Sequence, residues 1–304
     1  MTGAGDDVRI SFAIPYFENP GYLAEAVASV PAQTVPDWEL VVVDDAGPEP
    51  AEDVVRRLED PRIRYVRNDI RLGLPGNWNE SLRQLRGPLA TLLHGDDRLL
   101  PSYAEEVLAA AAARPDAAAV FTRTTIIDES GAPTRTFVDA AKSTLARRRD
   151  LGELSGDPGL AVLLGANLIS CPTLALRRDL LGDEPFDARW RFVADWDFTV
   201  RRLLEGGTLV GVDSPLLEYR RHAAQTTAQL SRDTQRFEEE LAFLRLMATE
   251  TADRGYFQAA RAARRRVATR AHLAADAAAD VAHGRLRTAG AKAGMLGRDL
   301  GRRG

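Results

Sequence analysis

Residues 8–45, VRISFAIPYFENPGYLAEAVASVPAQTVPDWELVVVDD, decide the fold, because they contain two apolar runs separated by a helical pattern. The runs Val8–Pro15 and Trp38–Asp45 have the length and the valine and isoleucine content of buried strands. Between the runs, apolar residues recur at helical spacing: Leu23, Ala26, Val27 and Val30. A strand, a helix and a strand in this order predict two parallel strands joined by a crossover helix.

The same alternation continues to about Arg220. Further helices are predicted at 51–60, 76–87 and 102–115, and further strands at 63–68, 88–97 and 117–128. These segments predict an α/β fold with a mainly parallel central sheet flanked by helices. Residues 129–159 are rich in turn residues and predict no clear element. Beyond His222 the chain is rich in alanine and arginine, which predicts a C-terminal helical extension.

The composition excludes several kinds of protein. A single cysteine, Cys171, rules out an intrachain disulfide and a cysteine-rich zinc site. A net charge of −4 gives no support to nucleic-acid binding. The first residues lack the pattern of a signal peptide, and no run of about 18 apolar residues occurs, as a membrane span requires. We therefore expect a cytoplasmic protein.

Carboxylates occur in three pairs at or beside the predicted strand ends: Asp44 and Asp45, Asp96 and Asp97, Asp195 and Asp197. The carboxyl ends of parallel strands line one crevice of an open sheet, so we expect these anions to lie near one another. A divalent cation prefers oxygen ligands and can join such carboxylates to a diphosphate. Each pair alone can equally be a polar turn that closes a strand, but three pairs in this order favour a functional site.

No P-loop and no glycine-rich dinucleotide motif follows a strand. A phosphate group in this crevice would therefore depend on a metal ion for charge neutralisation, which again selects the aspartates.

Five segments carry a family resemblance: FAIPYFENPGYLAEAVASVPAQTVPDWELVVVDDAG (12–47), RLGLPGNWNESLRQLRGPLATLLHGDDRLLP (71–101), NLISCPTLALRR (167–178), FVADWDFTVRRLLEGG (192–207) and SPLLEYRRH (214–222). In order and spacing they resemble glycosyltransferase family 2, from about Val8 to His222. The resemblance implies the GT-A fold, which is a Rossmann-like sheet flanked by helices. It also implies transfer of a sugar, with inversion, from a nucleotide donor to an acceptor hydroxyl.

The resemblance also implies a division of the chain. The catalytic domain is expected at 8–228, with a nucleotide-binding half at 8–100 and an acceptor-binding half at 101–228. The helical extension, 229–304, is not covered by the resemblance. The expected acceptor is a carbohydrate, a lipid-linked sugar or a small molecule that carries a hydroxyl group.

The donor site implied by the resemblance begins in the first loop, where family members usually have Pro, Thr, Tyr and Asn. Phe17 would stack on the base. Asp45 would accept a hydrogen bond from N3–H of uracil or thymine, which favours a UDP-sugar or a dTDP-sugar, whereas Asp44 is as readily structural. The full set of expected nucleotide-binding residues is Pro15, Phe17, Glu18, Asp45, Arg71, His94, Gly95, Asp96 and Arg220.

The metal site implied by the resemblance centres on Asp96, which would bind Mn²⁺ or Mg²⁺ on the diphosphate. His94 replaces the first aspartate of the family's Asp-x-Asp motif. Its imidazole can bind the metal, bond to ribose or phosphate, or simply pack at the strand end. His222 is a second expected metal ligand, or equally a loop histidine, and Arg220 or Arg221 would meet phosphate oxygens. Asp97 is expected to cap the element that follows.

Asp195 matches the family's catalytic base, which removes the proton from the acceptor hydroxyl. A single displacement needs only one such carboxylate, whereas a retaining mechanism needs a second as nucleophile. Asp197 is expected to be supporting, because residues 198–207 favour a helix that would turn it to another face. Trp196 is expected to be an acceptor platform or part of the core.

Two alternatives remain open. A sugar-nucleotide-binding protein without catalysis would keep the donor site, but the presence of both Asp96 and Asp195 argues against it. A Mg²⁺-dependent phosphotransferase would need a lysine near its aspartates, and the chain has only Lys142 and Lys292, in a predicted loop and in the tail. For the tail we expect packing on the catalytic domain, with peripheral contact at the inner face of a membrane or homodimer formation as alternatives.

Overall fold

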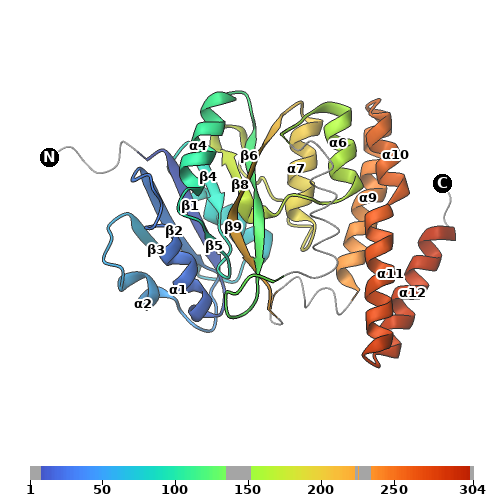
Figure 1. The fold of residues 1–304 in the computed structure, drawn as a ribbon, viewed down its shortest axis with the longest axis horizontal. Coiled ribbons are helices and arrows are strands. Elements are labelled where there is room, and N and C mark those ends of the chain that lie inside the picture. Colours follow the sequence, from blue (N-terminus) through green and yellow to red (C-terminus); the bar gives the residue numbers. More distant parts are fainter. Residues whose placement is uncertain (1–7, 135–151, 223–224, 226–233, 302–304) are drawn as a thin grey trace.

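The computed structural model describes residues 8–134, 152–222, 225 and 234–301. Its strands are β1 (Ile10–Tyr16), β2 (Trp38–Asp44), β3 (Ile63–Arg67), β4 (Leu89–Leu92), β5 (Arg98–Leu99), β6 (Ala119–Ile127), β7 (Glu153–Leu154), β8 (Leu174–Arg177) and β9 (Leu209–Arg220). They form one sheet in the order β3-β2-β1-β4-β8-β6-β9-β5, with β7 beside β9 (Figure 1). Lys142 and most of the turn-rich segment 129–159 lie outside the described residues.

The helices are α1 (Pro20–Ser29), α2 (Glu52–Arg56), α3 (Leu74–Arg83), α4 (Tyr103–Ala113), α6 (Gly156–Gly165), α7 (Ala194–Leu204), α9 (Gln235–Asp253), α10 (Phe257–Arg265), α11 (Val267–Ala282) and α12 (Leu286–Gly301). Helix α1 shows why the first of them forms where it does. Asn19 precedes it in a left-handed conformation and accepts a hydrogen bond from the N–H of Tyr22 at 3.4 Å, and Pro20 occupies the first turn.

The first half of the sheet confirms the predicted strand, helix and strand unit. β1 pairs in parallel with β2 on one side and with β4 on the other, and β2 pairs in parallel with β3. Pro15 interrupts no ladder on the β4 side, because that pairing ends at Ala13 and Leu92. β1 and β4 therefore separate at their carboxyl ends.

The second half of the sheet is mixed, so the predicted parallel pairing extends through β3-β2-β1-β4 and recurs only between β6 and β9 among the described strands. β8 lies antiparallel between β4 and β6, while β6 and β9 are parallel. The apolar pattern of a buried strand is the same in either direction, so the sequence does not encode this reversal.

Helices cover both faces of the sheet. Alternate residues of β1 and β2 point to opposite sides, so Phe12 and Val42 belong to one core and Ala13 and Val43 to the other. α1 and α4 contribute to the first core, and α3, α6 and α7 to the second. This second core also contains residues of α9 and α10.

The C-terminal helices pack on the rest of the chain, as expected (Figure 1). Asp157 at the start of α6 accepts hydrogen bonds from the N–H groups of Gln258 and Ala259, which begin α10. α11 and α12 form a hairpin whose small core includes Leu273 and Met295 and joins α9 through Phe237. In the part of the chain that the structure describes, every helix is too short or too polar to span a bilayer.

Buried charges hold the C-terminal hairpin in place. The carboxylate of Asp299, 1% exposed, accepts hydrogen bonds from Arg245, Arg266 and Arg270, which come from three different helices or their ends. Burial raises the pKa of Asp299, but the hydrogen bonds from Arg270 and Arg245 and the charge of Arg266 outweigh it, so the pKa is lowered. Asp299 is thus bound as an anion in the folded protein.

Replacing this carboxylate should destabilise the fold. In Asp299→Asn the buried cation of Arg266 loses its counter-charge, and we expect the free energy of unfolding to fall by roughly 3 kcal/mol at pH 7. Because the folded pKa is lowered, this contribution is complete above the unfolded pKa of about 3.9 and is lost as pH falls through the folded value. Thermal unfolding should therefore separate the two proteins at pH 7 and bring them closer together at low pH.

The matched control is Asp253→Asn, at an exposed position near the end of α9. It should change the free energy of unfolding by less than about 0.5 kcal/mol. Equal stability of Asp299→Asn and the parent at pH 7 would show that the three arginines do not depend on this carboxylate.

Candidate active site at the carboxyl end of the sheet

The candidate site lies where β1 and β4 separate. β2 and β3 are on one side of β1 and β4 is on the other, which makes this a topological switch point, and ligands of open α/β sheets bind outside the carboxyl ends of the strands at such points. Phe17 follows β1, Asp45 follows β2 and Asp96 follows β4. The strand order thus brings three of the predicted residues to one edge.

Asp44 is structural. Its buried carboxylate accepts hydrogen bonds from the N–H of Gly47 at 2.8 Å, the hydroxyl of Tyr65 at 2.5 Å and the guanidinium of Arg67 at 2.6 Å. These contacts tie the end of β2 to the end of β3. Of the two readings that the sequence left open for Asp44, this geometry supports the structural one.

Asp45 holds the segment that leads into α3. One carboxylate oxygen accepts hydrogen bonds from Asn68 at 3.1 Å and from the N–H of Leu72 at 2.7 Å, and the other accepts from the N–H of Gly73 at 2.9 Å. The side chain is buried. These bonds fix the position of Arg71, which lies within the anchored segment. A contact between Asp45 and a base stays a prediction.

The guanidinium of Arg71 lies over the ring of Phe17 beside the site. The guanidinium carbon of Arg71 lies 3.7 Å from the ring centroid of Phe17. Gly47 allows the loop to come this close, because a Cβ atom there would lie 1.8 Å from the carbonyl oxygen of Phe17. Glu18 is exposed beside them, and Pro15 is half-buried. The pair presents flat surfaces on which a base can stack.

Asp96 meets the end of β9. Its Oδ2 lies 3.0 Å from Nε2 of His222 and 3.3 Å from Nε2 of Gln225. The His222 ring packs against Tyr22, with centroids 4.9 Å apart. The structure therefore joins the two residues predicted as metal ligands, which are 126 positions apart in the sequence.

His94 packs at the strand end, against Trp78. The two rings are stacked with centroids 5.4 Å apart and an interplanar angle of 24°. Nε2 of His94 is buried and has no hydrogen-bond partner among the described residues. Burial lowers the pKa of His94, and the charge of Asp96 opposes this effect. His94 therefore packs at the strand end, as one of its three expected roles. Its Nε2 atom still has no partner among the described residues.

Asp97 does not cap a following helix, contrary to the prediction. It is fully buried, and its Oδ1 accepts a hydrogen bond from the backbone N–H of Arg220 at 2.9 Å. Its Oδ2 has no hydrogen-bond partner among the described residues and lies 3.9 Å from Nδ1 of His94. Burial, together with the charge of Asp96, raises the pKa of Asp97 well above its usual value.

The cluster fits a divalent cation. One potential ligand atom from each of His94, Asp96 and Asp97 lies within 4.8 Å of the others. One buried polar atom of this cluster, Oδ2 of Asp97, has no hydrogen-bond partner among the described residues and so has unused capacity for a ligand. Carboxylate oxygens and imidazole nitrogen form a donor set suited to Mn²⁺, and carboxylates alone suit Mg²⁺.

Arg220 is a structural residue of this site. Its fully buried guanidinium donates to the backbone carbonyl of Asp96 at 2.9 Å, to the carboxylate of Glu25 at 2.6 Å and to the carbonyl of Glu129 at 3.2 Å. Glu25 is shared with Arg98 at 3.0 Å. All three guanidinium nitrogens are thus occupied by protein groups, and the geometry does not support the expected direct contact with phosphate.

Glu25 was missed by the sequence analysis. It lies in α1, 195 positions before its partner Arg220, and nothing in its local pattern distinguishes it from an ordinary exposed helix residue. Tyr22, which packs on His222, was missed for the same reason. A Cβ atom added at Gly95 would lie at ordinary packing distances from Ile14 and Leu23, so the space around this position does not require glycine.

Asp195 lies in the first turn of α7, half-buried, and its Oδ1 accepts a hydrogen bond from the N–H of Trp196 at 2.7 Å. Asp197 is turned elsewhere, buried and bonded to Arg201 at 2.7 Å, as a helix predicts. Burial raises the pKa of Asp197, against the effect of Arg201. Trp196 is a core residue whose indole donates to the carbonyl of Leu163.

The thiol of Cys171 is subject to the charges of two acidic residues of the site. This buried residue lies in the 3-10 turn Cys171–Thr173, between α6 and β8. Burial raises the pKa of its thiol, and the charges of Asp195 and Asp97 raise it further.

Known proteins resemble this chain in sequence and in fold. The family model of glycosyl transferase family 2 matches residues 11–169. TuaG of Bacillus subtilis, described as a putative teichuronic acid biosynthesis glycosyltransferase, is 26% identical over 215 residues, which cover 69% of this chain and 78% of TuaG. Two uncharacterised relatives match over shorter stretches, and the chain covers only 29% and 14% of their lengths.

Solved structures share the fold. The mannosyltransferase PcManGT of Pyrobaculum calidifontis, in complex with GDP-Man and Mn²⁺, has a TM-score of 0.62 at 19% identity and covers 96% of this chain and 80% of its own. TarS 1–349 of S. aureus, in complex with UDP-GlcNAc, has a TM-score of 0.60 at 18% identity. The match covers 80% of this chain and 66% of the TarS chain. The fold is thus the GT-A fold, and because the family model matches more than half of its length, this chain belongs to glycosyltransferase family 2.

Proposed function

We propose that this protein transfers a sugar from a nucleotide diphosphate sugar to an acceptor hydroxyl, with inversion at the anomeric carbon. The observation that carries the proposal is the cluster of His94, Asp96 and Asp97 at the switch point of the sheet, which His222 joins through Asp96. In this proposal residues 8–100 bind the nucleotide, 101–228 bind the acceptor, and 229–304 support them.

The donor base is proposed to lie between the Phe17 and Arg71 pair and Asp45. A pyrimidine is favoured, so the donor is a UDP-sugar or a dTDP-sugar. The TarS complex with UDP-GlcNAc supports a uracil nucleotide, whereas the PcManGT complex contains GDP-Man. A panel of UDP-, dTDP- and GDP-sugars is therefore the first measurement to make.

The metal is proposed to be Mn²⁺ or Mg²⁺, held by Asp96 and His222 with His94 and Asp97 beside them. When bound, it neutralises negative charge on the leaving diphosphate. Arg220 contributes indirectly, because it holds the backbone of Asp96.

Asp195 is proposed to be the general base. It takes the proton from the acceptor hydroxyl while that oxygen bonds to the anomeric carbon, and the bond from this carbon to the diphosphate breaks. The products are the glycosylated acceptor and a nucleoside diphosphate. A binding protein without catalysis would bind the donor but release no diphosphate, and a phosphotransferase would have to act without Lys292, which is buried and paired with Asp276 and Asp280 in the hairpin.

The first prediction concerns the base. Asp195→Asn keeps the size of the side chain but cannot accept a proton, so metal-dependent release of nucleoside diphosphate should fall by roughly 100-fold or more while donor binding is retained. The measurements are diphosphate release across the donor panel and donor titration by calorimetry.

Asp53→Asn is the matched control, since Asp53 is an exposed acidic residue in the first turn of α2 and is not among the expected site residues. It should retain parental activity. A parent protein that shows no metal-dependent release with any panel donor would refute the transferase proposal, and full activity of Asp195→Asn would refute the role of Asp195.

The second prediction concerns the metal. Chelation with EDTA should abolish release of the nucleoside diphosphate, and Mn²⁺ or Mg²⁺ should restore it. The reason is that Asp96 and its neighbours need a cation to bind an anionic donor. In Asp96→Asn the added metal should restore little activity. Activity that persists in EDTA would contradict the metal proposal.

The third prediction concerns Glu25. In Glu25→Gln the buried guanidinium of Arg220 loses its counter-charge and holds Asp96 less firmly, so the Mn²⁺ concentration for half-maximal activity should rise roughly tenfold. Glu52→Gln, in an exposed ion pair with Arg56, is the matched control. An unchanged Mn²⁺ requirement in folded Glu25→Gln protein would show that this ion pair does not position the site.

Peripheral membrane contact and dimer formation through the C-terminal helices stay predictions. Val281 and Leu286, 56% and 68% exposed, lie at the end of the hairpin of α11 and α12, next to Arg287. Such a basic and apolar tip is compatible with an anionic bilayer.

A further inference from the structure

Glu239 in α9 contacts the segment that leads into the helix of Asp195. Its Oε2 accepts hydrogen bonds from the backbone N–H of Arg191 at 2.9 Å and of Phe192 at 2.7 Å. Helix α7 begins at Ala194, two residues later. One carboxylate oxygen from the C-terminal extension therefore fixes two successive amide groups immediately before the first turn that carries Asp195.

Side chains on the same helix strengthen this contact. The guanidinium carbon of Arg236 lies 4.6 Å from the ring centroid of Phe192. Phe243 packs against both Trp190 and Trp196, with ring centroids 6.0 Å and 5.1 Å apart. Residues on both sides of Asp195 are thus held by α9. Charge-assisted hydrogen bonds to backbone amides restrict a loop more strongly than apolar packing alone, because they are directional.

The segment bound by Glu239 is otherwise held by apolar burial, since Trp190, Val193 and Ala194 belong to the core. Val193, at the N-terminal boundary of α7, provides no side-chain cap, so the start of α7 depends on contacts from elsewhere. The carboxylate of Asp195 lies in the first turn, where any shift of the segment moves it directly. A displacement of about 1 Å can cost roughly 100-fold in rate when a reacting group is involved.

We infer that Glu239 is a positioning residue for Asp195, and that the C-terminal extension is thereby part of the active site. The inference rests on the proposed role of Asp195 as general base. Glu239 would not touch donor or acceptor. It would act through Arg191 and Phe192, so its loss should affect the chemical step and leave binding of the nucleotide sugar at the Asp96 side unchanged.

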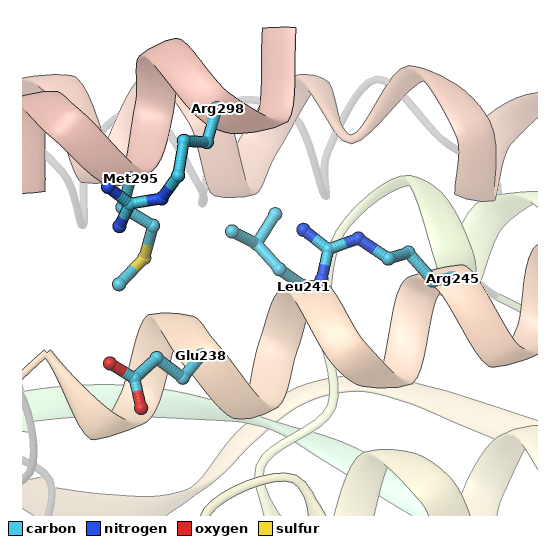
Figure 2. A pocket seen from close by; sticks show the side chains of 5 residues that line it. All are labelled: Glu238, Leu241, Arg245, Met295 and Arg298. Carbon is cyan, nitrogen blue, oxygen red and sulfur yellow. The ribbon is translucent and has the colours of Figure 1, made fainter. Parts of the chain in front are cut away.

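Glu238 provides a matched control in the same helix. Figure 2 shows its carboxylate on the side of α9 that faces α12, near Met295 and across from Arg298. These residues line a cavity of about 190 Å³, away from the Arg191 and Phe192 amides. Glu238 and Glu239 are adjacent and of the same type, but successive residues of a helix point about 100° apart.

The test compares Glu239→Ala, Glu239→Gln and Glu238→Ala with the parent protein. The donor is chosen from the panel of UDP-, dTDP- and GDP-sugars. It is the one from which the parent protein releases a nucleoside diphosphate in a metal-dependent way. In Glu239→Ala, kcat should fall roughly 10- to 100-fold, while KM and the donor Kd stay within about twofold. In Glu239→Gln the side-chain amide oxygen has two lone pairs and can accept the same two hydrogen bonds. This variant should therefore recover most of kcat. Glu238→Ala should match the parent.

Hydrogen exchange gives a second readout. In Glu239→Ala the amides of Arg191 and Phe192 should exchange faster than in the parent, whereas the amides of the Asp96 segment should not change. Parental kcat in folded Glu239→Ala, or equal losses in kcat in Glu239→Ala and Glu238→Ala, would overturn the inference. So would a loss confined to donor binding. A parent protein with no metal-dependent release would instead refute the proposed function, so the two failures are distinguishable.

Discussion

The fully buried guanidinium of Arg220 is the constraint on which the candidate site depends. It binds the backbone carbonyl of Asp96 and the carboxylate of Glu25, while the backbone N–H of the same residue binds Asp97. A buried cation is tolerated only where hydrogen bonds and an opposite charge compensate its loss of hydration. The position of Asp96 is therefore set jointly by α1, by the loop after β4 and by the end of β9, rather than by a local turn.

The contrast between two aspartate pairs shows where a ligand is still needed. Asp44 and Asp45 are buried, but each accepts at least three hydrogen bonds from protein groups. The hydrogen bonding of the pair after β4, Asp96 and Asp97, is less complete, because Oδ2 of Asp97 has no hydrogen-bond partner among the described residues. Buried polar atoms without partners are uncommon and costly, so a cation there would stabilise the folded state as well as bind a donor.

The sequence predicted the elements better than their contacts. Apolar runs and helical spacing identify β1, α1 and β2 because these patterns are local. The antiparallel direction of β8 has no such local signal. The carboxylates at the strand ends were found because the strand order of an α/β sheet brings those ends together. Glu25, Tyr22 and Glu239 were not found, because their partners are far away in the sequence and each looks like an ordinary helix residue.

Arg220 illustrates most clearly the limit of predicting contacts from the sequence. A position beside His222 and a positive charge favoured contact with phosphate, and the residue does lie at the site. Whether an arginine meets a ligand or a glutamate of the protein depends on the path of the surrounding chain, and this is a property of the tertiary fold. In the same way, the C-terminal helices were expected to pack on the catalytic domain, but the sequence carries no signal that Glu239, Arg236 and Phe243 of α9 would contact the segment around Asp195.

The most direct test of this account is to locate the metal itself. A crystal of the protein with Mn²⁺ and UDP should give an anomalous manganese peak at the carboxylate of Asp96, with the diphosphate next to it and the uracil beside Phe17. An ordered Mn²⁺ and nucleotide bound elsewhere, with the Asp96 and His222 contact unchanged and no metal near it, would contradict the central claim that this end of the sheet is the donor site.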